Sequence, residues 1–187
     1  TSEFVPQLAT EVPSIENGGI SADGKTVTFK IREGVKFSNG DALTPSAVAY
    51  SLQRGMLQGG TASPQWMYYE AFFGVGTDDV SLLVDPEGNL YDDRETLAKA
   101  DPATLVAACE KVKAAVVADD AAGTVTLNLA QPWAPLMATL TQTWGSVMDP
   151  KWVADNGGWD GSCDTWQNFY AMQSADDPFT SIAMGTG

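Results

Sequence analysis

Residues 23–54 constrain the fold more strongly than any other part of this 187-residue chain. The stretch opens with an Asp-Gly turn dipeptide, and residues 26–31 then alternate β-branched or aromatic side chains with polar ones. This alternation is typical of a half-buried strand. Residues 35–37 resume the alternation before the tight turn at Asn39-Gly40, so we expect a short antiparallel unit here.

A helix is predicted directly after this unit. Thr44 is a residue type that caps helices, and Pro45 suits the first helical position because it lacks an amide hydrogen. Apolar residues then recur at helical spacing as far as Gly59-Gly60, where the helix should end.

The rest of the chain contains further elements of both kinds. The patterns predict helices at residues 65–74, 101–119 and 132–143, and strands at 80–84, 90–91 and 123–130. The tail, residues 149–187, is rich in Trp, Asp and Gly and predicts short helical or irregular pieces. Together these patterns predict an α+β fold with an antiparallel sheet and several packed helices.

Composition excludes several classes of function. The formal net charge is -14, with ten basic residues, which argues against binding nucleic acid because that needs a basic surface. Histidine is absent, so the commonest general base and the usual zinc ligand are missing. We expect no cofactor, no metal and no catalytic residues. The acidic segment 85–93 lacks the glycine and glutamate of an EF-hand, since Leu90 and Thr96 occupy those positions.

The two cysteines leave two alternatives open. Cys109 lies in a predicted helix and Cys163 in a Gly-rich loop, so they form no CxxC motif. An oxidising compartment would permit a disulfide between them. Otherwise Cys109 is a small buried residue and Cys163 an unpaired loop thiol.

Residues 65–74 form the densest aromatic segment. In a helix, Trp66 and Tyr69 lie on one face and Tyr68 on another, so one core cannot bury every ring. Exposed tyrosine and tryptophan can line a ligand cleft, because they combine rigid apolar contact with a hydrogen-bonding tip. The alternative is a helix that serves the core alone.

The order of motifs resembles the extracytoplasmic solute-binding proteins, family 5, of the oligopeptide, dipeptide and nickel ABC importers. The resemblance lies in PQLA at residues 6–9, DGKTVTFKIREGVKFSNGDALT at 23–44, AVAYSLQR at 47–54, VTLNLAQPWAPLMATL at 125–140, and the terminal Gly-Thr-Gly. Members of that family are usually several times longer, so the resemblance implies that this chain is a fragment. It also implies the small extra domain of a type II (class C) periplasmic binding receptor.

The resemblance further predicts an organisation and a role. Residues 1–187 would be a single domain, with 1–14 and 176–187 linking it to a missing large lobe. The intact receptor would be extracytoplasmic, periplasmic or lipid-anchored, and monomeric. It would perform no covalent chemistry, capture a solute, most directly a peptide, and deliver it to the ABC permease. Ligand-facing aromatics are expected at Trp66, Tyr68 and Tyr69, with Tyr68 matching best, and at Trp144 in a loop that approaches the ligand or packs between lobes.

Two alternatives from other classes remain. Clustered tryptophans and carboxylates also suit a saccharide-binding module, although the strand-poor tail argues against a β-sandwich lectin. A glycosidase-like domain would need two facing carboxylates across a Trp-lined cleft, and no local motif supports one.

Overall fold

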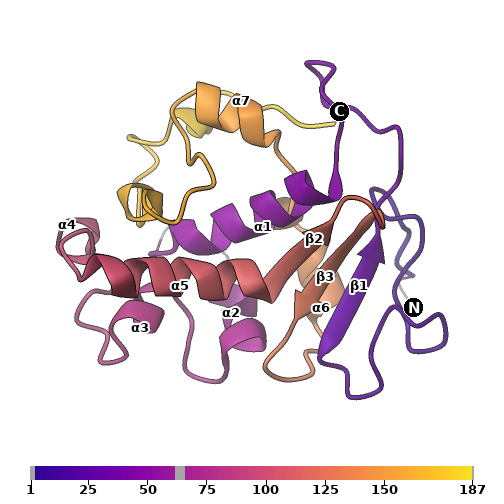
Figure 1. Ribbon diagram of the computed structural model, residues 1–187, viewed down its shortest axis with the longest axis horizontal. Coiled ribbons are helices and arrows are strands. Elements are labelled where there is room, and N and C mark those ends of the chain that lie inside the picture. Colours follow the sequence, from indigo (N-terminus) through magenta and orange to yellow (C-terminus); the bar gives the residue numbers. More distant parts are fainter. Residues whose placement is uncertain (1–2, 62–65, 187) are drawn as a thin grey trace.

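The computed structural model describes residues 3–61 and 66–186, without the side chains of Tyr68 and Trp144. It contains a three-stranded antiparallel sheet in the order β1-β3-β2, formed by β1 (Thr26–Lys30), β3 (Thr124–Asn128) and β2 (Val116–Asp119). The sheet lies at one end of the molecule, and helices α3 (Ser81–Val84) and α4 (Arg94–Leu97) lie at the other (Figure 1). The predicted α+β class is confirmed.

Period-2 alternation gives the sheet one apolar and one polar face. Val27 pairs with Leu127, and the apolar face they share is covered by α1 (Pro45–Gln58). On the opposite face the hydroxyls of Thr28 and Thr126 are 3.2 Å apart. The sequence alternation of residues 26–31 therefore reports a sheet that is buried on one side only.

The two long helices begin where their caps predict. The Thr44 side chain accepts a hydrogen bond from the Ala47 amide at the start of α1, and α1 ends before Gly59. Asp101 accepts from the Thr104 amide at the start of α5 (Pro102–Ala115). Both helices have proline in the first turn, as expected from its fixed φ.

Four sequence predictions about this central region are wrong. The helix predicted over 101–119 ends at Ala115, because residues 116–119 form β2 and pair with β3. The strand predicted over 80–84 is the short helix α3, and the returning strand at 90–91 lies in turns before α4. The helix predicted over 132–143 is reduced to α6 (Leu136–Leu140), which begins only after Pro135.

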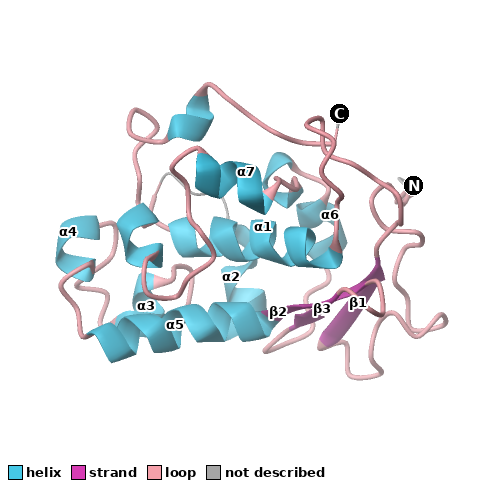
Figure 2. Ribbon diagram, turned by 45° about the horizontal axis from the view of Figure 1, so that its top comes forward, coloured by secondary structure: helices cyan, strands magenta, loops and turns pink. Residues whose placement is uncertain are grey.

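The tail consists of short pieces, as predicted. Its helical parts are α7 (Pro150–Asp155), η2 (Trp166–Phe169) and η3 (Pro178–Thr180). Its largest side chains pack inward: Trp159 is 2% exposed, Trp166 is fully buried, and the Trp159 ring stacks on Tyr50 at a centroid distance of 5.3 Å. In Figure 2, α7 lies over α1, so the tail covers the helical layer.

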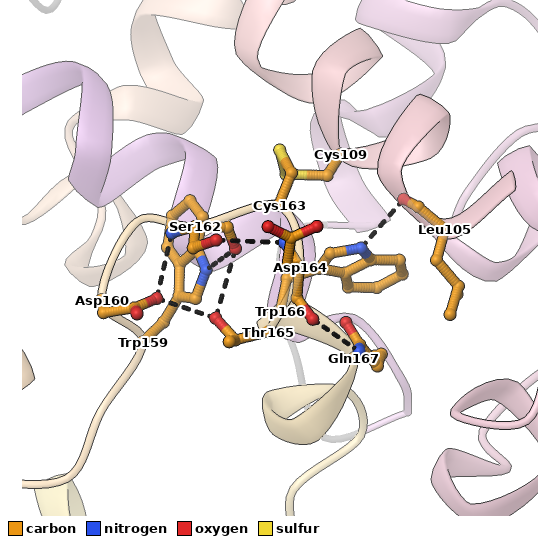
Figure 3. The surroundings of a disulfide bond; sticks show 10 residues. All are labelled: Leu105, Cys109, Trp159, Asp160, Ser162, Cys163, Asp164, Thr165, Trp166 and Gln167. Carbon is orange, nitrogen blue, oxygen red and sulfur yellow. Dashed lines mark hydrogen bonds between the residues drawn. A yellow bond between two sulfur atoms is a disulfide. The ribbon is translucent and has the colours of Figure 1, made fainter. Parts of the chain in front are cut away.

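A disulfide between Cys109 and Cys163 joins the tail to α5, and the sequence separation of the two cysteines is 54. Figure 3 shows Trp159 and Trp166 on either side of Cys163. The Trp166 indole donates a hydrogen bond of 3.0 Å to the Leu105 carbonyl, which lies in α5, the helix that also carries Cys109. Of the two alternatives that the sequence leaves open, the structure has the bonded pair. In the described part of the chain no helix has the length and apolar character to cross a membrane.

Candidate functional site

The aromatic segment folds as α2 (Trp66–Phe73), as predicted. Trp66 is 58% exposed, whereas Tyr69 is 1% exposed. The Tyr69 ring lies 4.9 Å from the Phe73 ring, and its hydroxyl donates to the Met56 carbonyl at 3.4 Å. Trp66 is thus the ring that the core does not bury, as expected, whereas Tyr69 lies in the core.

The side chains of Tyr68 and Trp144 lie outside the described residues, but their backbones are placed. Tyr68 is in α2, and Trp144 is in η1 (Thr143–Gly145). Helix α2 packs against α6, and η1 follows α6 closely and contacts it. The Ala130 amide donates to the Ala71 carbonyl at 2.8 Å, which ties the end of β3 to α2. Tyr68 and Trp144 thus lie on two elements, α2 and η1, that both contact α6.

A glycine pair starts the connection from α1 to α2. Gly59 and Gly60 have φ values of 44° and 71°, which side chains rarely adopt. A Cβ at Gly59 would lie 2.6 Å from an Asp79 carboxylate oxygen, and one at Gly60 would lie 2.8 Å from the Ala171 Cβ. Both positions therefore require glycine for conformation and for space.

A buried carboxylate fixes this pair. Asp79 is 2% exposed and accepts hydrogen bonds from the amides of Gly60 (2.6 Å) and Ser81 (2.8 Å) and from the Tyr170 hydroxyl (2.9 Å). These three donors compensate the cost of burying its charge. Burial raises the pKa of the Tyr170 hydroxyl, which keeps it protonated as a donor.

Asp92 extends this polar cluster to the next residue of the connection. Its amide donates to the Tyr170 hydroxyl at 2.8 Å, and its carboxylate accepts from the amide and hydroxyl of Thr61 at 3.0 and 2.9 Å. The polar clamp, by which we mean Asp79, Asp92 and Tyr170, thus holds residues 60–61 from three separate parts of the chain. It fixes where the segment toward Trp66 begins.

An open pocket of about 510 Å³ lies beside η1. The inner face of the sheet, α1 and α6 supply apolar lining, and the loop around η1 borders it. Residues near both ends of the chain complete the lining. The lining side chains and backbones come from Phe4–Ala9, Glu11–Pro13, Phe29, Ile31, Val48, Leu52, Val125, Leu127, Met137, Leu140–Gln142, Gly145–Val147 and Gly185–Thr186.

Most of the described lining residues of this pocket are apolar. Glu11 is the single carboxylate among the described lining residues, and it lies 2.9 Å from the Lys30 ammonium. Glycoside hydrolysis requires a pair of carboxyl groups, so the described pocket lining gives that alternative no support. The described residues contain no group of three or more potential metal-binding side chains.

The pocket does not unite the predicted wall residues. Neither Trp66 nor Tyr69 is among its described lining residues, whereas Gly145, the residue after Trp144, is. Sequence reasoning missed the pocket because residues 4–13 were interpreted only as a connection. The signal that could have shown it is the apolar character of Phe4, Val5 and Leu8, since a connection with three large apolar residues has a surface to cover.

Comparison with known proteins gives one family. The profile described as "Bacterial extracellular solute-binding proteins, family 5 Middle" matches residues 3–187. Among curated proteins, the chain is similar to "Di/tripeptide-binding protein 2" of Pseudomonas aeruginosa (strain UCBPP-PA14), with 27% identity over 157 residues, or 80% of this chain and 24% of that protein.

Two solved structures share the fold. Listeria monocytogenes OppA bound to peptide matches with a TM-score of 0.54 and 21% identity over 98% of this chain and 26% of that chain. The pheromone receptor PrgZ matches with a TM-score of 0.53 and 18% identity over 97% of this chain and 26% of that chain. The predicted resemblance to a domain of type II periplasmic binding proteins is confirmed at the level of the fold. The chain spans about a quarter of the length of these relatives.

Proposed function

Since this chain belongs to the bacterial extracellular solute-binding proteins of family 5, we propose that it is one domain of the substrate-binding component of an ABC importer. The receptor captures a peptide outside the cytoplasm and delivers it to the permease. The observation that carries this proposal is the family match over residues 3–187. Listeria monocytogenes OppA is bound to peptide in its structure, and the Pseudomonas aeruginosa relative is a di/tripeptide-binding protein, so both support peptide as the cargo.

We propose that residues 1–187 are a single domain, with 1–14 and 176–187 leading to the rest of the receptor. The quarter-length match to the relatives supports this organisation. The disulfide supports an oxidising, extracytoplasmic location, in which the receptor would be a monomer that is either periplasmic or lipid-anchored at the cell surface.

In this domain, Trp66 is the wall residue for which exposure gives direct support, at 58%. Tyr68 and Trp144 remain proposed wall residues from the resemblance. A receptor of this kind closes two lobes on its ligand, so its affinity depends on contacts in both. This domain alone should therefore bind little, and it should catalyse no reaction.

A thermal-shift comparison tests the proposal. The full-length receptor and the 187-residue chain are each mixed with dipeptides, longer peptides, saccharides and divalent metals, because a ligand that binds the native state raises its unfolding temperature. We expect a response of the full-length receptor to peptides and none from the 187-residue chain. A response of the 187-residue chain to saccharides would contradict the importer proposal and favour a saccharide-binding module.

A matched pair of variants locates the wall. Trp66→Ala in the full-length receptor should weaken peptide binding by about tenfold, the effect of removing an aromatic contact. Val75→Ala is the control, because Val75 is 79% exposed just beyond the opposite end of α2. Equal effects of the two substitutions in titration calorimetry would remove Trp66 from the proposed wall.

A further inference from the structure

The tail of the chain changes its packing at Ala171. Before this position its large side chains are buried, with Trp166 and Tyr170 fully covered and Cys163 bonded to α5. Residues 172–186, in contrast, are all half-buried or exposed. In Figure 1 the yellow end of the chain runs past α7 toward the sheet side of the molecule. The last part of the tail therefore lies on the surface of the domain and not in its core.

Residues 172–183, which we call the strap, lie between two points where backbone hydrogen bonds attach the tail to the rest of the domain. At one end the Ala171 amide donates to the Gln58 carbonyl at 2.6 Å, and beyond the other end the Ser38 amide donates to the Gly185 carbonyl at 2.9 Å. The backbone hydrogen bonds described for the strap itself join its own residues. Its attachment to the helices beneath it therefore depends on side chains.

The Phe179 ring makes the closest side-chain contacts between the strap and these helices. It lies 5.5 Å from the Trp152 ring of α7, and the Arg54 guanidinium of α1 lies over it at 4.9 Å. Gly158 provides the space for the ring, because a Cβ there would lie 2.6 Å from a Phe179 ring carbon. The ring thus occupies a site formed by three separate parts of the chain.

The polar contacts between the strap and the body of the domain are weak. The Gln58 side chain donates to the Asp177 carboxylate at 3.4 Å, which is long for a hydrogen bond. The Arg94 guanidinium lies 4.0 Å from the Asp176 carboxylate, and water screens this pair because both side chains are exposed. Phe179 is half-buried, so its aromatic and cation–π contacts keep more of their energy.

We propose that the strap opens as a unit separate from the rest of the domain, and that the Phe179 ring is the latch that holds it closed on α1 and α7. When the ring leaves its site, the contacts with Arg54 and Trp152 are lost together. The buried part of the tail keeps its disulfide and its packed rings, so the opening stops at Ala171. The proposal concerns the 187-residue chain alone and does not depend on the proposed function.

Limited proteolysis of the 187-residue chain tests the proposal. When opening is fast relative to cleavage, the rate of cleavage follows the population of the open form. Phe179→Ala should raise the rate of cleavage within the strap about tenfold, because it removes both ring contacts. The rate of cleavage within residues 159–171 should not change. A broad-specificity protease, with the cut sites identified by mass spectrometry, measures both rates.

Ile182→Ala is the matched control, since it also shortens an apolar side chain of the strap and Ile182 is 41% exposed. We expect this variant to be cut at the wild-type rate. Equal rates of strap cleavage in the wild type and Phe179→Ala would overturn the latch, as would an equal acceleration by Ile182→Ala. If Phe179→Ala accelerates cleavage of residues 159–171 by the same factor, the tail opens as a whole and the strap is not a separate unit.

A second variant displaces the ring and leaves the strap sequence intact. Gly158 has no positive φ, and in Gly158→Ala the added methyl group would meet Phe179 at 2.6 Å and a Val153 methyl at 2.5 Å. Gly185→Ala is its control, because Gly185 also has no positive φ and nothing lies within 4 Å of its Cβ position. Chymotrypsin should cut after Phe179 faster in Gly158→Ala and at the wild-type rate in Gly185→Ala. The same rate in both variants would contradict the latch.

Discussion

Removing the disulfide should destabilise this domain mainly through its unfolded state. The perturbation is the double substitution Cys109→Ala/Cys163→Ala in the 187-residue chain. In the folded state, the Trp166 hydrogen bond to Leu105 and the stacking of Trp159 on Tyr50 still hold the tail against the helices. We therefore expect the same native fold with a looser unfolded chain.

The structure sets the magnitude. The cross-link closes a loop with a sequence separation of 54 residues. For a loop of this length, the chain-entropy relation gives about 4 kcal/mol at 25 °C. Cys109 is fully buried, so its replacement by alanine adds a packing loss of about 1 kcal/mol. Native domains are stable by only about 5–15 kcal/mol, so the variant should be close to unfolding.

Urea denaturation followed by tryptophan fluorescence measures this loss. The oxidised protein, the reduced wild type and the double variant are compared at one pH. The reduced wild type should lose about 4 kcal/mol and the double variant about 5 kcal/mol. Both should show a larger dependence of the unfolding free energy on urea, because their unfolded chains expose more surface. A loss under about 1 kcal/mol with an unchanged urea dependence would refute the entropic reasoning.

Two further predictions concern the turns. Gly60→Ala should lower the unfolding free energy by about 3 kcal/mol, because Gly60 has a φ of 71° and a Cβ there would lie 2.7 Å from an Asp92 oxygen. The control is Gly18→Ala, since Gly18 has a similar φ but nothing lies close to its Cβ position. In the same urea assay this control should lose about 1 kcal/mol. Hydrogen bonds from the Ser162 amide and the Thr165 hydroxyl lower the pKa of Asp160, so its stabilisation is present above the unfolded-state pKa and lost as pH falls through the folded-state value. Asp160→Asn should therefore flatten the decline of the urea midpoint between about pH 4 and pH 2, and a decline as steep as that of the wild type would contradict this account.

Local signals predicted the elements whose ends are determined by their own side chains. Thr44 and Asp101, each followed by proline, placed the starts of α1 and α5 correctly, because a cap acts within one turn of the helix. The alternation of residues 26–31 predicted β1 correctly, because the alternating side chains and the face that they bury lie on the same strand.

Tertiary pairing decided the elements that sequence reasoning missed. Residues 116–119 continue the apolar pattern of α5, but the Gln53 side-chain amide donates to the Val116 carbonyl at 2.7 Å and the strand pairs with β3. Partners distant in sequence therefore override the helical pattern. The pocket is also a product of tertiary structure, because its lining comes from segments as distant as Val5 and Gly185.

The tail reaches the proposed aromatic wall through the polar clamp. Cys163 fixes the tail to α5, and Tyr170, in the same part of the tail, donates to Asp79, which in turn accepts from the Gly60 amide. The Ala171 amide donates to the Gln58 carbonyl at 2.6 Å, so the tail also holds the last residue of α1 directly. A tail with few regular elements therefore fixes the end of α1 and the two residues that follow Gly59.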